Sequence, residues 1–207
     1  MIRFYKTPWI TRALYSSLTW RIPSKDSIFL TFDDGPHPEA TSWVLDQLDQ
    51  VNAKATFFCL GRNLEAHSDL AENILVKGHK LGNHSFNHLK GWKTDDVDYL
   101  NDLALCDQQL KTLDSQTSLF RPPYGRISRS QLKKLSDKQV VMWSHLSWDF
   151  DPDLNVEKSL KKLKQAKPGS ILVFHDSAKA FKNLKQILPE ILAHFHAKGL
   201  KFEAIKS

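Results

Sequence analysis

The chain has 207 residues, which is enough for one well-packed domain and short for two. Its composition, 41% hydrophobic and 25% charged with a formal net charge of +6, is that of an ordinary globular protein and excludes a disordered, fibrous or repeat protein. The 2 cysteines have no close-spaced partner, which excludes a disulfide framework and a thiolate metal site. We expect Cys59 and Cys106 to be buried as small apolar residues.

Residues 1–24 are expected to form a helical extension that packs on the outside of the main domain, residues 25–207. One helical face is apolar and comprises Trp9, Ile10, Ala13, Leu14 and Leu18. The alternative is a helix that lies on a membrane surface. No apolar run approaches the roughly 20 residues that cross a bilayer, and this stretch is too polar for a signal peptide. We therefore expect no transmembrane segment, no export signal and, by default, a cytoplasmic location.

From residue 28 onward, short apolar runs alternate with segments of helical spacing. The expected strands are 28–32, 55–60, 79–82, 119–121, 140–143, 171–174 and 200–205. The expected helices are 39–50, 69–77, 95–113, 128–135, 156–165 and 182–197, the last with a kink at Pro189. This alternation predicts an α/β fold with a mostly parallel sheet, as either an open doubly wound sheet or a nearly closed barrel.

The positive net charge favours anionic partners, but its distribution does not indicate nucleic-acid binding. Lysines such as Lys161, Lys162 and Lys164 fall on one expected helix, where a solvated outer face is the simpler interpretation. We therefore predict no nucleic-acid partner, and the sequence does not predict an oligomeric state. Histidines away from the strand ends are assigned to the surface or to helices, among them His79 and His145; a role for His37 is left open.

Chemically useful residues follow the expected strands. The first strand ends in TFDDGP at 31–36, the third runs into HSFNH at 84–88 and the fourth into RPPYG at 121–125. Asp149 follows the fifth strand and His175 follows the sixth. Because the carboxyl ends of parallel strands share one edge, we expect these residues to converge on one cleft.

The pair His84 and His88 indicates a metal site. The two residues are four apart, so one helical turn would point both imidazoles at a single ion. A carboxylate from Asp33 or Asp34 would complete three ligands and leave a position for the attacking water, as a hydrolytic zinc requires. The other aspartate is then free to act as base. The expected cofactor is a divalent metal, zinc first, with cobalt, nickel or ferrous iron as alternatives.

A second proton carrier is needed on the opposite side of the cleft, to protonate the departing nitrogen. His175 suits this role, and the carboxylate of Asp149 would hold its protonated form. Arg121 is expected to fix the free aspartate through a charge-assisted hydrogen bond. The competing interpretation is structural, since Asp-Gly-Pro is turn chemistry and the Pro122–Pro123 step can be a rigid loop.

The set TFDDGP, HSFNH, RPPYG, the aspartate of SWDFD and GSILVFHD, in this order, resembles the polysaccharide deacetylase family, also called the NodB homology domain or carbohydrate esterase family 4. The likeness covers about residues 27–205. It implies a single-domain, distorted (β/α)7 barrel that hydrolyses acetyl groups from N-acetylglucosamine units. The expected partner is therefore an N-acetylated amino sugar.

The resemblance also implies a role for each residue around the expected cleft. Asp33 would be the general base, paired with Arg121, and Asp34 would be a metal ligand together with His84 and His88. On the opposite side, His175 would be the general acid and Asp149 its tuning carboxylate. The backbone N–H of Tyr124, which follows Pro123 in the RPPYG loop, would join the metal in stabilising the oxyanion.

The chain departs from the family pattern in two places. Phe150 stands where the family usually has tryptophan, and Trp148 is expected to compensate in the apolar wall. Val173 stands where leucine usually lines the acetyl-methyl pocket, which would be slightly wider and still accept acetyl. Trp92, in the loop after His88, is expected to face the sugar.

These patterns predict a metal-dependent hydrolase that removes N-acetyl groups from an N-acetylglucosamine-containing polysaccharide or oligosaccharide. One alternative is an amide hydrolase, a deacetylase or deformylase, of a small or lipid-linked sugar. A second alternative is a carbohydrate-binding protein that keeps the fold and has lost the chemistry. The intact metal and acid–base residues argue against the second alternative.

Overall fold

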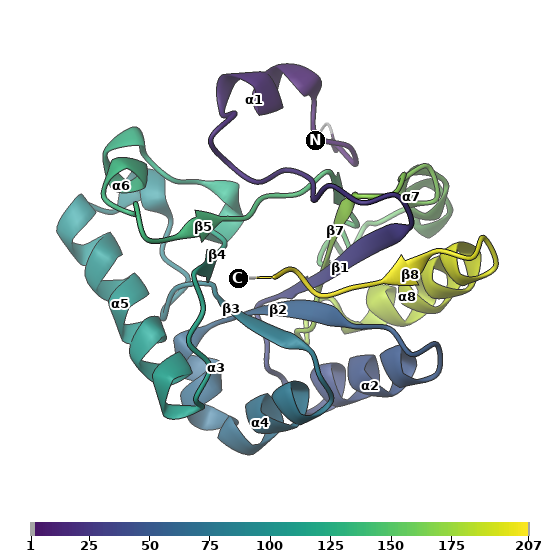
Figure 1. Ribbon diagram of the computed structural model, residues 1–207, viewed down its shortest axis with the longest axis horizontal. Helices are drawn as coiled ribbons and strands as arrows, with labels where there is room; N and C mark the ends of the chain where they lie inside the picture. Colours follow the sequence, from purple (N-terminus) through teal and green to yellow (C-terminus); the bar gives the residue numbers. More distant parts are fainter. Residues whose placement is uncertain (1–2, 207) are drawn as a thin grey trace.

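Every named strand pair in the sheet is parallel, which is the arrangement that the alternating strands and helices predict. The computed structural model describes residues 3–206, and its strand order is β5-β4-β3-β2-β1-β7-β6, with β8 paired to β1 (Figure 1). The strands are β1 Ser27–Asp33, β2 Ala55–Cys59, β3 Lys80–Asn83, β4 Leu119–Phe120, β5 Gln139–Val140, β6 His145–Leu146, β7 Ile171–His175 and β8 Lys201–Phe202.

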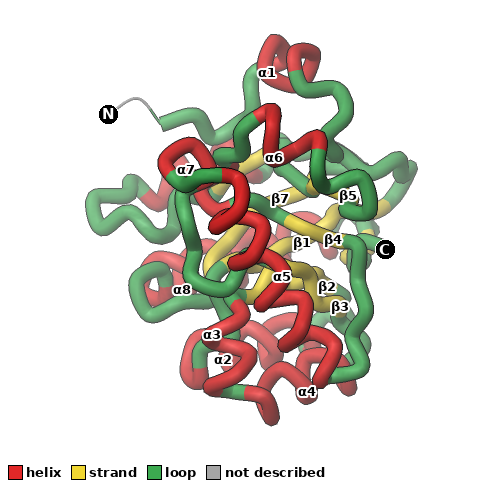
Figure 2. The backbone as a smooth tube through the Cα atoms, turned by 90° about the vertical axis from the view of Figure 1, so that its left-hand side faces the viewer, coloured by secondary structure: helices red, strands yellow, loops and turns green. Residues whose placement is uncertain are grey.

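Helices surround the curled sheet, as Figures 1 and 2 show. They are α2 Pro38–Asp49, α3 Gly61–Ala66, α4 Ser68–Val76, α5 Asp96–Thr112, α6 Arg129–Lys133, α7 Val156–Leu163 and α8 Phe181–His196, while α1 Trp9–Leu14 stands apart. Two short 3-10 turns are η1 Gly91–Lys93 and η2 Pro123–Gly125. The short helix α3 was not expected from the sequence, and α8 continues through Pro189.

One chain segment, residues 139–146, closes the barrel. Its first part, β5, pairs with β4, and its last part, β6, pairs with β7. Between them the N–H of Val141 donates to the carbonyl of Phe120 at 2.8 Å, and the N–H of Ser144 donates to that of Ile171 at 3.0 Å. The single strand expected at 140–143 is therefore two short strands with different partners, and the expected single-domain, distorted (β/α)7 barrel is confirmed.

The faces of the strands separate two apolar layers, because successive side chains point to opposite sides. On β1, Ile28, Leu30 and Phe32 pack outward against the helices, whereas Phe29 lies in a smaller cluster inside the barrel. Each such buried side chain contributes about 1.5–3 kcal/mol of transfer free energy. Asp33 shares the inward face of Phe29 but stands at the carboxyl end of the strand. The barrel interior is therefore apolar at one end and polar at the other.

The C-terminal tail fills the apolar end of the barrel. β8 ends at Phe202, earlier than the expected strand 200–205, because the tail leaves the sheet and turns inward. Ile205 joins the interior cluster, and its N–H donates to Thr56 Oγ1 at 2.9 Å. Figure 1 shows the C-terminus at the centre of the ring of strands. A ligand site is thereby confined to the opposite end.

The N-terminal helix forms, but only Leu18 of its expected apolar face is buried, and it lies beyond the end of the helix. None of the residues of α1 is buried, and Trp9 and Leu14 are each 70% exposed. The segments on either side are anchored instead: the N–H of Leu146 donates to the carbonyl of Tyr5, and Thr19 pairs with Val141. Because both ends are held by the barrel-closing segment, the chain between them arches away from the barrel and carries α1 with it.

Two histidines that were expected at the surface are buried in this fold. His79 Nδ1 accepts a hydrogen bond from the N–H of Ala55 at 3.2 Å, and His145 Nδ1 lies 3.0 Å from Ser144 Oγ. Burial lowers the pKa of both imidazoles to about 4, so they are neutral packing residues. Both cysteines are buried and free, as expected. Among residues 3–206, no helix combines the length and apolarity that a membrane span requires.

Candidate active site

A cleft of about 570 Å³ lies at the carboxyl ends of the strands. The sequence-predicted residues that line it are Asp33, Asp34, His84, His88, Tyr124, Trp148, Val173 and His175. Arg121 and Asp149 are fully buried and contact Asp33 and His175 from below. Convergence of residues from separate strands is therefore observed, as the shared edge of a parallel sheet requires.

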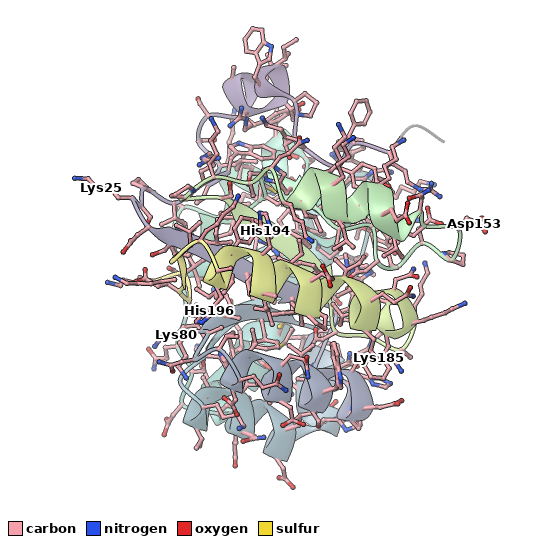
Figure 3. The ribbon with its side chains drawn as sticks, turned by 90° about the vertical axis from the view of Figure 1, so that its right-hand side faces the viewer. Lys25, Lys80, Asp153, Lys185, His194 and His196 are labelled. Atoms are coloured by element: carbon pink, nitrogen blue, oxygen red, sulfur yellow. The ribbon has the colours of Figure 1, made fainter. Side chains whose placement is uncertain are left out.

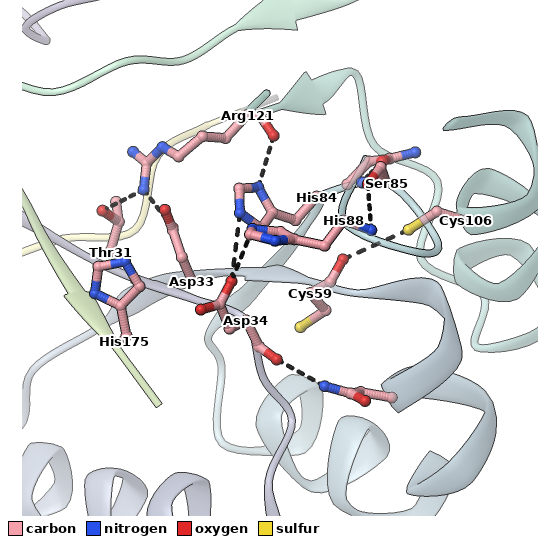
Figure 4. A network of polar contacts seen from close by, with 12 residues as sticks. Thr31, Asp33, Asp34, Cys59, His84, Ser85, His88, Cys106, Arg121 and His175 are labelled. Atoms are coloured by element: carbon pink, nitrogen blue, oxygen red, sulfur yellow. Dashed lines mark hydrogen bonds and ion pairs between the residues drawn. The ribbon is translucent and has the colours of Figure 1, made fainter. Parts of the chain in front are cut away.

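Asp34, His84 and His88 form a cluster that fits a metal ion. Asp34 Oδ1 lies 3.3 Å from His88 Nε2 and 3.6 Å from His84 Nε2, and the ligand atoms all lie within 4.8 Å of one another (Figure 4). Asp34 Oδ1 is buried and has no hydrogen-bond donor among the described residues. A buried carboxylate oxygen without a donor is costly, and a cation between it and the imidazoles removes that cost. The donor set, two imidazoles and one carboxylate, suits zinc.

The protonation state of His84 also suits a metal ligand. Its Nδ1 lies 2.6 Å from the backbone carbonyl of Arg121, which only accepts hydrogen bonds, so Nδ1 carries the proton. The lone pair of Nε2 is then directed at Asp34. Burial, followed by the neighbouring His88, lowers the pKa of His84 to about 3. The imidazole is therefore neutral and free to coordinate.

The two histidines lie on a loop and not on the helical turn that their spacing indicated. Ser85 and His88 have φ angles of 65° and 63°, which no right-handed helix allows. Asp102 of α5 holds this loop, because its carboxylate accepts hydrogen bonds from the backbone N–H groups of 86 and 87 at distances of 3.0 Å. The spacing predicted the convergence of the imidazoles but not the conformation that produces it.

Arg121 supports the Asp33 side of the cleft from a fully buried position. Its Nη1 donates to Asp33 Oδ1 at 2.6 Å and to Thr31 Oγ1 at 2.8 Å. Its Nε and Nη2 donate to the carbonyls of Val141 and Met142, each at 3.1 Å (Figure 4 shows the Asp33 and Thr31 contacts). All three nitrogens of the guanidinium therefore donate hydrogen bonds, and its positive charge offsets the negative charge of Asp33.

His175 and Asp149 form the opposite side of the cleft. The backbone N–H and Nδ1 of His175 both contact the Asp149 carboxylate, at 2.8 and 2.7 Å. Asn183 of α8 fixes the aspartate further by donating to its backbone carbonyl at 2.8 Å. Burial lowers the pKa of His175, but the charge and hydrogen bond of Asp149 outweigh it and raise the pKa to about 9. The imidazole is therefore protonated near neutral pH and able to donate.

Aromatic side chains form the walls between these groups. Phe150 packs edge-on against the His175 ring with centroids 4.8 Å apart, and Trp148 lies 5.4 Å from Phe150. On the facing wall, the Tyr124 ring lies 4.5 Å from that of His88. Two lysines that the sequence did not single out, Lys90 and Lys179, also line the cleft. Apolar rings beside cationic groups suit a polar, hydroxyl-rich ligand with flat faces.

Trp92 and Pro123, the other residues predicted for the substrate-binding part of the site, do not line the cleft. Trp92 stands on η1 outside the cleft lining, where its indole N–H donates to the carbonyl of Ile127 at 2.9 Å and Arg126 covers its ring. Pro123 is buried beneath the rim at the start of η2. Trp143 borders both the core and the cleft. Trp92 therefore has no contact with the cleft that would support the expected sugar-facing role.

The rim also concentrates strained backbone. Left-handed φ angles occur at Asp34, His88, Tyr124 and Trp148, with values of 78°, 63°, 59° and 61°. In non-glycine residues such angles cost on the order of 1–3 kcal/mol each and persist only where the surroundings impose them. Four such residues around one cleft indicate that their positions serve the site.

A parallel β/α barrel with an Asp–His–His cluster that could hold a metal ion, a neighbouring carboxylate and an opposed histidine has the groups that a metal-dependent hydrolase requires. The sequence profile described as polysaccharide deacetylase matches residues 21–143. A peptidoglycan-N-acetylglucosamine deacetylase of Bacillus cereus is 36% identical over 167 residues, which are 77% of each chain. A chitooligosaccharide deacetylase of Azorhizobium caulinodans is 32% identical over 162 residues, 74% of this chain and 75% of the relative.

Among solved structures, the Bc1960 peptidoglycan N-acetylglucosamine deacetylase, crystallised with 4-naphthalen-1-yl-N-oxidanyl-benzamide, superposes with a TM-score of 0.86 at 30% identity. The match covers 96% of this chain and 95% of that one. The chain therefore belongs to the polysaccharide deacetylase family, and the resemblance inferred from its motifs is confirmed.

Proposed function

We propose that this protein is a metal-dependent deacetylase that hydrolyses the N-acetyl group of N-acetylglucosamine units in a polysaccharide or oligosaccharide. The observation that carries the proposal is the placement of three groups around one cleft. These are the Asp34, His84 and His88 cluster, the Asp33–Arg121 pair and the His175–Asp149 pair. The printed names of the relatives, deacetylases of peptidoglycan and of chitooligosaccharide, support the same chemistry.

Asp34, His84 and His88 would hold the divalent metal, for which zinc is our first choice. When bound, such an ion supplies positive charge that polarises the acetyl carbonyl and lowers the pKa of water. The neutral imidazole of His84 and the donor-free oxygen of Asp34 match this requirement.

Asp33 would take the proton of the attacking water. Its side chain is almost fully buried at the floor of the cleft, and the ion pair with Arg121 keeps one oxygen occupied while the carboxylate lines the cleft. The backbone N–H of Tyr124 would donate a hydrogen bond to the oxygen that becomes negative during the attack. Val173 would contact the acetyl methyl group, since it lines the same cleft between these groups.

His175 would complete the reaction as the general acid. An amide nitrogen leaves only after it is protonated, and the imidazolium of His175 is the available donor opposite Asp33. Asp149 holds that proton at neutral pH through its charge and its 2.7 Å contact with Nδ1. The other ring nitrogen remains to deliver a proton to the substrate.

The test is acetate release from chitin-type oligomers and from peptidoglycan fragments, by purified protein with and without a chelator and after addition of Zn²⁺, Co²⁺, Ni²⁺ or Fe²⁺. Acetate release that the chelator stops and a metal restores supports the proposal, with Asp33→Asn protein as the inactive matched control. Release only from N-acetylated monosaccharides or lipid-linked sugars would move the substrate to the small-molecule class. Retained sugar binding with no release under any metal would make the protein a carbohydrate-binding protein and contradict the proposal.

A further inference from the structure

The positive charge of this protein is concentrated near its N-terminus. Residues 3–25 include Arg3, Lys6, Arg12, Arg21 and Lys25, and the first acidic residue of the chain is Asp26. The other 24 basic residues are nearly balanced by the 23 acidic residues, so almost the whole net charge of +6 belongs to this segment. The barrel itself is close to neutral.

The same segment exposes large apolar side chains. Trp9 and Leu14 are each 70% exposed, Phe4 is 59% exposed and Ile10 is 54% exposed. The exposed large apolar side chains elsewhere in the described chain are spread over four other elements: Val76 on α4, Trp92 on η1, Val97 and Leu105 on α5, and Tyr124 on η2. Four large exposed apolar side chains within residues 4–14 indicate an interaction surface and not scattered exposure.

The fold holds this surface away from the barrel. Tyr5 and Leu18 are buried on either side of α1, and the N–H of Leu146 donates to the carbonyl of Tyr5 at 3.0 Å. Figures 1 and 3 show α1 projecting beyond the ring of strands and helices. The apolar side chains thus lie on a segment that is anchored to the barrel on both sides, and the rest of the molecule does not cover them.

We propose that residues 3–14, which we term the N-terminal arch, bind the surface of a membrane that contains anionic lipids. Trp, Phe, Ile and Leu side chains that alternate with Arg and Lys are the composition of interfacial segments, in which apolar groups enter the headgroup boundary and cations meet lipid phosphates. Each basic residue at such a surface strengthens binding to anionic lipid about 5-fold. The proposal does not depend on the catalytic activity.

A second copy of the chain fits this surface less well. A two-fold interface would bring two arches together, each with the basic residues Lys6 and Arg12 and with no acidic residue within residues 3–14 to pair them. A stable dimer buries about 1,200–2,000 Å² in total, more than four exposed apolar side chains on a six-residue helix and the irregular segment before it provide. A membrane with anionic lipids supplies negative charge for the basic side chains and an apolar layer into which the exposed apolar side chains can insert.

The arch is joined to the cleft. The indole N–H of Trp148, which lines the cleft, donates to the carbonyl of Phe4 at 3.2 Å, and Arg3 pairs with Asp151 at 2.7 Å. The first residues of the N-terminal arch therefore lie next to Trp148, which forms part of the cleft wall.

The test is sedimentation of the untagged protein with vesicles of phosphatidylcholine alone and of phosphatidylcholine mixed with phosphatidylglycerol. We expect binding to the mixed vesicles that weakens as salt is added, and little binding to phosphatidylcholine. The triple variant Trp9→Ser, Ile10→Ser and Leu14→Ser should bind at least 10-fold more weakly. A control triple variant of exposed apolar residues elsewhere, Val76→Ser, Val97→Ser and Leu105→Ser, should bind as the wild type does.

A charge variant gives a second, independent readout, because all the side chains changed are exposed and need not alter folding. Lys6→Gln should weaken binding about 5-fold, while Lys80→Gln, an exposed lysine on β3, should leave it unchanged. Absence of sedimentation with anionic vesicles, or equal sedimentation of the two triple variants, overturns the proposal. A concentration-dependent dimer in gel filtration that the α1 triple variant abolishes would assign the surface to a second copy and also overturn it.

Discussion

The backbone carbonyl of Arg121 lies 2.6 Å from Nδ1 of His84. The guanidinium of the same arginine lies 2.6 Å from the carboxylate of Asp33. One residue therefore directs the lone pair of a candidate metal ligand and positions the candidate base. The Asp34 side and the Asp33 side of the cleft therefore share this support.

Replacing Arg121 with Met should destabilise the protein by about 3–5 kcal/mol, because it leaves the Asp33 carboxylate buried without its partner. The measurement is the free energy of unfolding from urea denaturation. Arg129→Met, an exposed arginine at the start of α6, is the control and should change it by less than about 0.5 kcal/mol. The double variant with Asp33→Asn should recover part of the loss; an equal or larger loss would show that the charge of Asp33 is not the cause.

Asp33→Asn and His84→Ala should separate metal binding from proton transfer. Asp33→Asn removes the proton acceptor without touching the cluster, so acetate release should fall by at least about 100-fold while bound metal stays stoichiometric. His84→Ala should lose both, since it removes one of the three ligand atoms. Metal content by elemental analysis and acetate release are measured on the same samples. Near-normal release by Asp33→Asn would assign the base to another group.

Asp149→Asn should move the alkaline limb of the pH–rate profile to lower pH. His175 must be protonated to donate, so activity is present below its pKa of about 9 and is lost as the pH rises through that value. A bound divalent cation lowers this pKa, so the wild-type limb should fall at or below pH 9. Without the charge of Asp149 the limb should move toward and below the ordinary histidine value near 6.5. An unchanged alkaline limb would exclude His175 as the group that this limb reports.

Asp102→Ala should weaken metal binding although Asp102 is not a ligand. Its carboxylate holds the loop between His84 and His88 through backbone hydrogen bonds, and loss of such support costs about 10–100-fold in metal affinity. Affinity is measured by competition with a chromogenic chelator. Asp98→Ala, an exposed aspartate on the same helix, should keep the wild-type affinity. Equal affinities of the two variants would mean that the loop holds its conformation without Asp102.

The sequence was most informative where local pattern and chemistry coincide. Asp33, His84 and His175 each follow an apolar run, and parallel strands bring such positions to one edge whatever the details of the loops between them. The family membership and the barrel followed from the same motifs and are confirmed. The catalytic roles assigned to these residues remain predictions, to which the observed distances add geometric support.

The features that the sequence did not predict depend on contacts between distant segments. Thr31 and Arg121 meet across the barrel interior, Asn183 reaches Asp149 from α8, and Asp102 reaches the histidine loop from α5. No spacing or composition signals such hydrogen bonds, because they link residues far apart in the chain. The exposure of α1 is of the same kind, since the pairing of its flanking segments with the barrel decides it.

The alternation of strands and helices along the chain, the ligand types and the charge of the N-terminal segment were determined by the sequence alone, since each follows from hydrophobic period, side-chain chemistry or simple composition. Only the tertiary structure decided that segment 139–146 closes the barrel, that His84 and His88 converge through a left-handed loop and that the arch stays uncovered. The physical reason is that backbone hydrogen bonds must be satisfied throughout the molecule at once, and the partners that satisfy them lie on segments far apart in the chain.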